Sequence, residues 1–159
     1  MPKFAAGSSL YGWDAPETKI RSVRKRCALY TAAVLILSIV SGLLPTGVTR
    51  HNWVGFAGTA ALAAVMLEMI AVVRFWAAKS QMDYRSFHSI HWMMDYAPLL
   101  HAMLMAIALI AGIVSCIQNY TGETDILVLF LYILAAAASL MTRRTYRVLP
   151  TYTIKEQET

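Results

Sequence analysis

The sequence predicts an all-α integral membrane protein, built as a bundle of four transmembrane helices. Of its 159 residues, 58% are hydrophobic and only 14% are charged, whereas soluble domains average about 25% charged residues. Four long apolar runs follow one another along the chain, and each is long enough to cross the hydrocarbon core of a bilayer. Lysine and arginine gather outside these runs, which is typical of the ends of membrane helices.

The limits of each segment follow from local signals. The first apolar run ends before Pro45 and Gly47, which break helices, and Gly122 lies in the turn before the last run. The residues before the first run mix small, aromatic and charged types without helical periodicity. The predicted segments are an N-terminal arm (1–26), one four-helix transmembrane domain (27–142, with helices at 27–44, 53–78, 92–117 and 125–142) and a C-terminal tail (143–159).

The positive charge indicates an orientation in the membrane. Six Lys or Arg residues precede the first run, two lie between the second and third, four follow the fourth, and only Arg50 lies in a connection on the other side. Basic residues favour the cytoplasmic side, so we expect a multi-pass protein of a plasma or inner membrane with both termini in the cytoplasm. The net charge of +5 then reflects this orientation, and no nucleic-acid partner is expected.

Glu68 and His101 are the candidate ligand or proton site. A carboxylate inside a membrane span is costly unless it is paired, solvated or protonated. With a rise of about 1.5 Å per residue, Glu68 lies roughly 16 Å from Lys79, and His101 lies roughly 14 Å from Trp92, so both have a similar depth. Antiparallel packing of the two helices would allow a direct hydrogen bond between them, and this pair would either bind a cation or a proton or only clamp the two helices together. The alternative is that the two side chains have unrelated orientations.

Two further groups of ionisable residues lie near the inner boundary. Arg74 and Asp95 are close enough in depth to form an ion pair, unless Arg74 reaches the headgroups and Asp95 faces water. His88, His91 and Asp95 have the i, i+3 and i+7 spacing of one helix face, which is a weak pattern for a metal site. No pattern names a cofactor, and haem is disfavoured because no second histidine matches the depth of His101.

The sequence leaves several functions open. Small residues on the second and fourth runs, such as Gly58, Ala61 and Ala135, favour close helix contacts, so we expect a homo-oligomer or a complex with a larger membrane partner. One hypothesis is an oligomeric or accessory component of a transporter or channel with an intramembrane Glu/His centre. The alternatives are a non-transporting assembly protein and a metal-dependent membrane enzyme, although the absence of catalytic motifs speaks against an enzyme.

Overall fold

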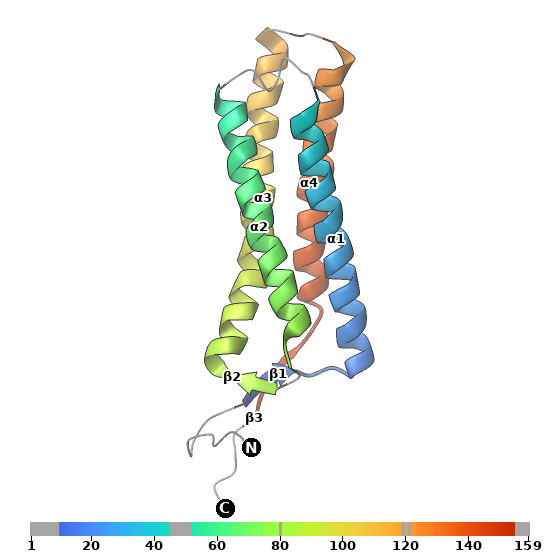
Figure 1. The fold of residues 1–159 in the computed structure, drawn as a ribbon, viewed down its shortest axis with the longest axis vertical. Coiled ribbons are helices and arrows are strands. Elements are labelled where there is room, and N and C mark those ends of the chain that lie inside the picture. Colours follow the sequence, from blue (N-terminus) through green and yellow to red (C-terminus); the bar gives the residue numbers. More distant parts are fainter. Residues whose placement is uncertain (1–9, 45–51, 80, 119, 121, 155–159) are drawn as a thin grey trace, which may run out of the picture.

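The computed structural model describes residues 10–44, 52–79, 81–118, 120 and 122–154. In this part of the chain, four helices stand side by side and three short strands lie at one end of them (Figure 1). The helices are α1 (Glu17–Leu43), α2 (Asn52–Ala77), α3 (Tyr84–Gln118) and α4 (Glu123–Tyr146), and the strands are β1 (Leu10–Trp13), β2 (Gln81–Asp83) and β3 (Thr151–Ile154). All four helices are long and apolar enough to cross a membrane.

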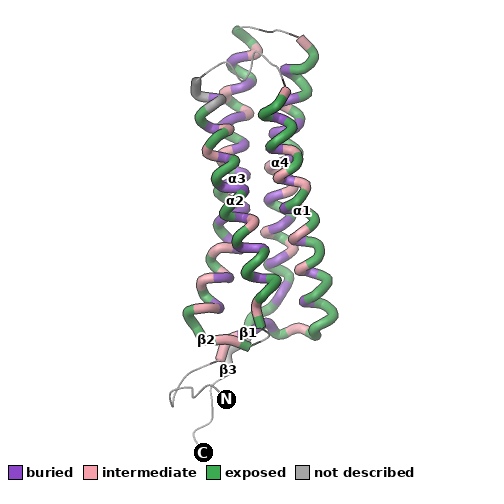
Figure 2. The backbone as a smooth tube through the Cα atoms, viewed as in Figure 1, coloured by how far each residue is buried: buried purple, intermediate pink, exposed green. Residues whose placement is uncertain are grey.

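The helices form an up-down-up-down bundle in which α1 and α3 each pack against α2 and α4. Buried positions recur at intervals of three and four residues (Figure 2), which is the spacing of helices that pack almost antiparallel with interlocking side chains. In α4, for example, this series runs through Asp125, Val128, Tyr132, Ala135, Ser139, Thr142 and Tyr146. Small residues in the series, such as Ala61 and Ala135, allow close approach of the helices.

The helices α1 and α3 begin well before their predicted starts at residues 27 and 92. The α1 helix begins at Glu17, because the buried spacing continues through Ile20 and Val23 before the apolar run starts. The α3 helix begins at Tyr84, after Asp83, whose Oδ2 accepts the backbone N–H of Ser86 at 3.0 Å. This hydrogen bond satisfies an amide that the helix itself leaves unpaired. Hydrogen bonds from the Ser86 side chain and from its backbone N–H lower the pKa of the Asp83 carboxyl.

The three strands form an antiparallel sheet that the all-α prediction does not include. Its order is β2-β1-β3, with Leu10 opposite both Asp83 and Ile154. Each strand has only three or four residues, which is too few for a recognisable alternation of polar and apolar types. The sheet joins the segment before α1, the α2–α3 connection and the segment after α4, so it ties three separate parts of the chain together. We call this end of the bundle the basal end and the opposite one the apical end.

Two apolar clusters fill the interior. The basal cluster contains Trp13, Phe75, Phe87 and Tyr146, whose rings meet at centroid distances between 5.1 and 5.6 Å. The remaining buried members come from α1, α2, α3 and the segment after α4: Ile20, Val23, Cys27, Ala71, Val72, Ile90, Met94 and Leu149. The apical cluster contains smaller side chains: Val54, Ala57, Ala61, Met105, Ala108, Val128, Tyr132 and Ala135.

Trp13→Ala should lower the free energy of unfolding by about 3 kcal/mol, because it removes a large ring from the middle of the basal cluster. Trp76→Ala is the matched control, since the Trp76 side chain is 47% exposed on the outer face of α2 whereas Trp13 is 3% exposed. The control should change stability by less than about 0.5 kcal/mol. Unfolding in mixed micelles with a denaturing detergent, followed by circular dichroism, measures both. Equal losses would show that β1 does not anchor the basal end.

Candidate functional site

One polar layer crosses the bundle between the two apolar clusters. It contains one side chain from each helix, and each residue is at most 4% exposed. We call these four residues the polar layer: Thr31 of α1, Glu68 of α2, His101 of α3 and Ser139 of α4. Neighbouring polar side chains on the basal side extend it, because Thr31 Oγ1 lies 3.5 Å from Thr142 Oγ1 and Cys27 Sγ lies 3.7 Å from the Thr142 carbonyl oxygen.

The Glu68 carboxylate accepts one hydrogen bond at each oxygen. Thr31 Oγ1 donates to Oε1 at 2.8 Å, and Ser139 Oγ donates to Oε2 at 2.8 Å. A carboxylate buried without partners would cost several kcal/mol, so these two hydroxyls make its position in the interior tolerable. Thr31 belongs to α1 and Ser139 to α4, so Glu68 connects α1, α2 and α4.

Ser139 also links Glu68 to His101. The Ser139 Oγ lies 2.7 Å from His101 Nδ1. A serine hydroxyl has one proton, and when that proton is donated to Glu68 the oxygen must accept from the imidazole. This direction requires a proton on His101 Nδ1, which leaves Nε2 as the open nitrogen of the ring.

The open nitrogen is a buried polar atom without a partner. Among the described residues, no group forms a hydrogen bond with His101 Nε2, although its accessible area is below 1 Å². Unpaired buried polar atoms are uncommon in folded proteins and often have a functional reason. Here the open nitrogen is one end of a chain of hydrogen bonds whose other end is the Glu68 carboxylate.

The sequence predicts that Glu68 and His101 lie at similar depth and form a direct hydrogen bond. The structure puts both in one layer, but it places the Ser139 hydroxyl between them. Ser139 and Thr31 are not among the predicted site residues, because single hydroxyl residues in an apolar helix are common and carry no charge. Their helical spacing was the available signal: both lie in the series of buried positions of their own helices.

A mainly apolar cavity with several hydroxyl groups in its wall lies on the apical side of this layer. Its volume is about 230 Å³, and its walls carry the side chains of Ser38, Ser41, Thr59, Met105 and Tyr132. Ser38 Oγ is buried without a partner in the described part of the chain. Ser38 is seven residues from Thr31 along α1, or about 10 Å, and Met105 is one helical turn from His101, or about 6 Å. The cavity therefore ends close to the imidazole.

The predicted ion pair between Arg74 and Asp95 does not form. Asp95 Oδ2 instead accepts Arg147 Nη2 at 2.8 Å, and Asp95 Oδ1 accepts Arg143 Nε at 3.1 Å. The reason is that α4 extends to Tyr146 and brings two arginines one turn apart to the basal half of α3. The hydrogen bond with Asp95 raises the pKa of Arg147. Arg74 donates to Ser89 Oγ at 3.0 Å.

The predicted metal ligands do not come together either. Within the described ranges, no group of three His, Cys, Asp or Glu side chains is placed to hold a metal ion. Asp95 forms ion pairs with Arg143 and Arg147, and His91 Nδ1 lies 3.0 Å from the Tyr146 hydroxyl. The His88 ring is stacked on Tyr84, with ring centroids 5.4 Å apart. Side chains at i, i+3 and i+7 share one helix face, but here each of the three has a different neighbour.

No protein-family model, curated protein or solved structure matches this chain. Among the described residues, the polar layer combines two ionisable side chains, Glu68 and His101, with the Ser139 hydroxyl that connects them and an open ring nitrogen. Such an arrangement can bind a proton and pass it along the chain of hydrogen bonds.

Ser139→Ala should lower the free energy of unfolding by about 2 kcal/mol, because it leaves one Glu68 oxygen and one His101 nitrogen without partners. Ser115→Ala is the matched control: Ser115 is also buried in a helix, but its Oγ has no partner among the described residues. The control should be neutral or slightly stabilising. Detergent-induced unfolding measures both variants, and a neutral Ser139→Ala would mean that the three side chains do not form one network.

Proposed function

We propose that the chain is a small integral membrane protein, a component of a transporter or channel, whose polar layer binds and passes on a proton. Four helices of sufficient length and hydropathy support the membrane placement. Large apolar side chains are exposed on the outside of the bundle, including Leu43, Phe56 and Ile117, at 77%, 71% and 80%. Such a surface is expected to face lipid.

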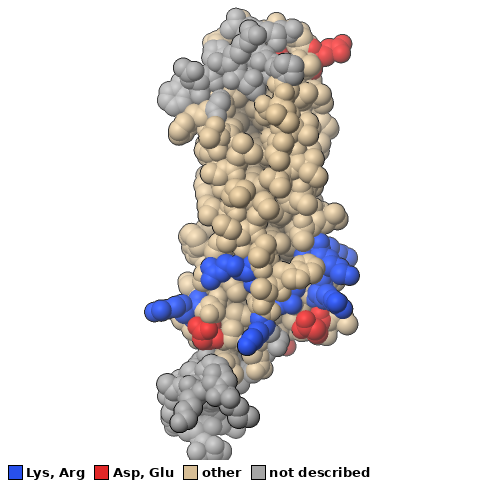
Figure 3. All heavy atoms as spheres, in the orientation of Figure 1, with Lys and Arg blue, Asp and Glu red and all other residues tan. Residues whose placement is uncertain are grey.

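The charges support an orientation with the basal end in the cytoplasm. Lys and Arg side chains gather near the basal end, and a broad belt without charge lies above them (Figure 3). Cytoplasmic ends of membrane helices are rich in these residues. Both termini would then be cytoplasmic in a plasma or inner membrane, and the cavity beside Met105 would be reached from the outer side.

The hydrogen-bond chain from His101 through Ser139 to Glu68 is the observation that carries the proposal. A proton that reaches His101 Nε2 forms an imidazolium. The proton on Nδ1 then moves to Ser139 Oγ while the Ser139 proton moves to Glu68 Oε2. The products are a neutral imidazole with a proton on Nε2 and a protonated Glu68, so one proton has moved inward and Ser139 is unchanged. Histidine is suited to this step because one of its ring nitrogens can accept a proton while the other donates one.

Access to the polar layer is proposed to be one-sided. The apical cavity ends about one turn from His101, whereas aromatic rings of the basal cluster fill the bundle on the other side of the layer. Release toward the cytoplasm would therefore need a movement of Phe75 and Tyr146, which pack edge to face at 5.2 Å. Such a movement is the expected place for coupling to a second copy or a larger membrane partner.

A second function is supported by one specific observation. Both Glu68 oxygens accept hydrogen bonds from hydroxyls, which is also the arrangement of a static clamp that fixes how four helices pack. In that case the chain would be a non-transporting assembly protein. The two functions differ in what happens when the proton-binding group is replaced by a neutral one of the same shape.

Proton flux into liposomes tests the proposal. The chain, purified in mild detergent with any proteins that remain bound, is reconstituted with an internal pH-sensitive dye, and a pH difference is applied. Glu68→Gln keeps the shape and one acceptor of the side chain but cannot carry the proton, so flux should fall about tenfold or more. His101→Ala should do the same, while both variants insert into the membrane as the parent does.

Ser115→Ala is the control for this measurement, because it removes a buried hydroxyl outside the polar layer. Its flux should equal that of the parent. If Glu68→Gln and His101→Ala also equal the parent in flux, the polar layer is not the site. Loss of copurifying proteins without loss of flux would favour the assembly function.

A further inference from the structure

Two grooves on the outside of the bundle lie on either side of the contact between Arg74 and Met93. The first, of about 290 Å³, lies between α2 and α3 and has almost entirely apolar walls. The second, of about 440 Å³, lies nearer the basal end, and Arg74 and Lys79 are part of its wall. The contact of Arg74 Nη1 with Met93 Sδ at 3.3 Å separates them, since Met93 lines the first groove and Arg74 the second.

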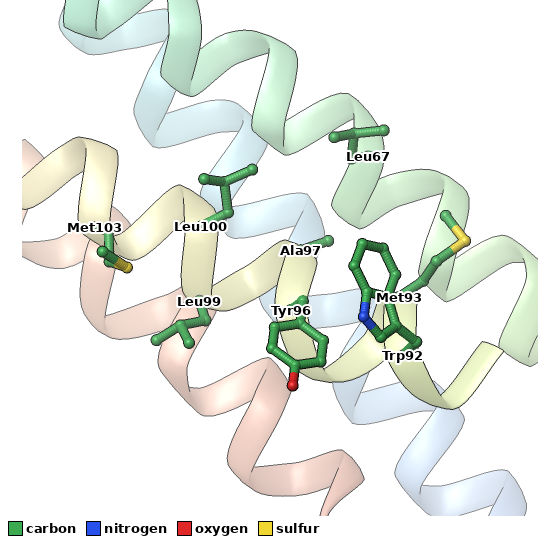
Figure 4. Close-up of a pocket in the computed structure, with 8 residues that line it drawn as sticks. All are labelled: Leu67, Trp92, Met93, Tyr96, Ala97, Leu99, Leu100 and Met103. Carbon is green, nitrogen blue, oxygen red and sulfur yellow. The ribbon is translucent and has the colours of Figure 1, made fainter. Parts of the chain in front are cut away.

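The apolar groove has the shape of a channel along the outside of α3. Trp92, Tyr96 and Met103 lie along one side of it, and Leu67 of α2 lies across from Leu100 (Figure 4). From Trp92 to Met103 the helix rises about 16 Å, and these side chains are roughly half exposed. A flexible apolar chain that lies along this groove would cover side chains from two helices at once.

The second groove supplies positive charge. Arg74 donates from Nη1 to the Ser89 hydroxyl and to Met93, which orients the guanidinium. No carboxylate of the described residues lies within ion-pair distance of it, unlike Arg143 and Arg147, which share Asp95. Lys79 adds a second cation. Asp83 also lines this groove. Its carboxylate accepts the Ser86 amide at the start of α3 and keeps its negative charge, so two cations and one anion line the groove.

We propose that the two grooves together bind one anionic phospholipid, with an acyl chain along α3 and the phosphate between Arg74 and Lys79. Apolar walls next to a groove with an excess of positive charge match a molecule with an acyl chain and a negative headgroup. Trp92 and Tyr96 lie at the level where aromatic side chains meet headgroups. A second copy of the chain is a poorer match, because parallel copies would bring two strongly basic basal ends together. This site rests on the membrane placement proposed above but not on proton binding.

Quenching of Trp92 fluorescence by brominated acyl chains tests the site. The full chain carries Phe in place of Trp13, Trp53 and Trp76, and circular dichroism verifies its helical content. It is reconstituted in phosphatidylcholine vesicles that contain a small fraction of either brominated phosphatidylglycerol or brominated phosphatidylcholine. Two cations near a headgroup predict a preference of about tenfold for the anionic lipid at Trp92.

Charge variants decide whether the preference belongs to this site. Arg74→Gln combined with Lys79→Gln should bring the preference close to one, and the Arg85→Gln control should keep it, because Arg85 is exposed at the basal end but lines neither groove. Equal quenching by the two lipids in the parent would overturn the proposal. An equal loss in Arg85→Gln would overturn it too, since it would reveal only the general charge of the surface.

Inorganic phosphate separates a lipid site from a site for a free anion. Millimolar phosphate should leave the lipid preference unchanged, because it lacks the acyl chain that fills the apolar groove. If phosphate abolishes the preference, the basal groove binds a soluble anion and the proposal is wrong. Unchanged proton flux in the Arg74 and Lys79 variants, together with a lost lipid preference, would show that lipid binding and proton transfer are separate properties of the chain.

Discussion

The carboxylate of Glu68 is the group on which the arrangement of the bundle depends. It is fully buried, and without partners it would destabilise the fold by several kcal/mol. Thr31 and Ser139 supply one hydroxyl each, and Ser139 in turn binds His101. One side chain from each helix is therefore fixed relative to the others. Apolar contacts at intervals of three and four residues tolerate a shift of one turn, whereas this layer pairs correctly in only one register.

The two sides of the polar layer differ in a way that gives the bundle a direction. On the apical side are small side chains and a cavity with hydroxyl groups. On the basal side are packed aromatic rings. Beyond them, the sheet connects the segment before α1, the α2–α3 connection and the segment after α4. The pairing of Asp95 with Arg143 and Arg147 adds a polar link between α3 and α4 there. Because Asp95 pairs with Arg143 and Arg147, Arg74 has only neutral partners among the described residues. Its positive charge is therefore available to the anionic lipid that we propose.

The helices and the two most unusual residues could be predicted from the sequence, because long apolar runs and an acid among them are strong signals. Glu68 and His101 stand out for this reason, and the depth estimate put them in one layer. Ser139 could not be singled out, since serine is common in apolar helices and its role depends on which face of α4 meets α2. The partner of Asp95 depends on how far α4 extends beyond its apolar run. The strands β1 and β3 pair across almost the whole chain, and four residues carry too little pattern to predict that pairing.

The most direct test of this account is the protonation state of the His101 ring nitrogens, measured by nitrogen NMR on chain with isotope-labelled histidine and assigned by comparison with His101→Asn. The account predicts that Nδ1 carries a proton in a hydrogen bond, and that its signal shifts in Ser139→Ala and in Glu68→Gln but not in Ser115→Ala. A signal for Nδ1 that is the same in the parent, Ser139→Ala and Glu68→Gln would contradict a hydrogen-bonded chain between the imidazole and the carboxylate.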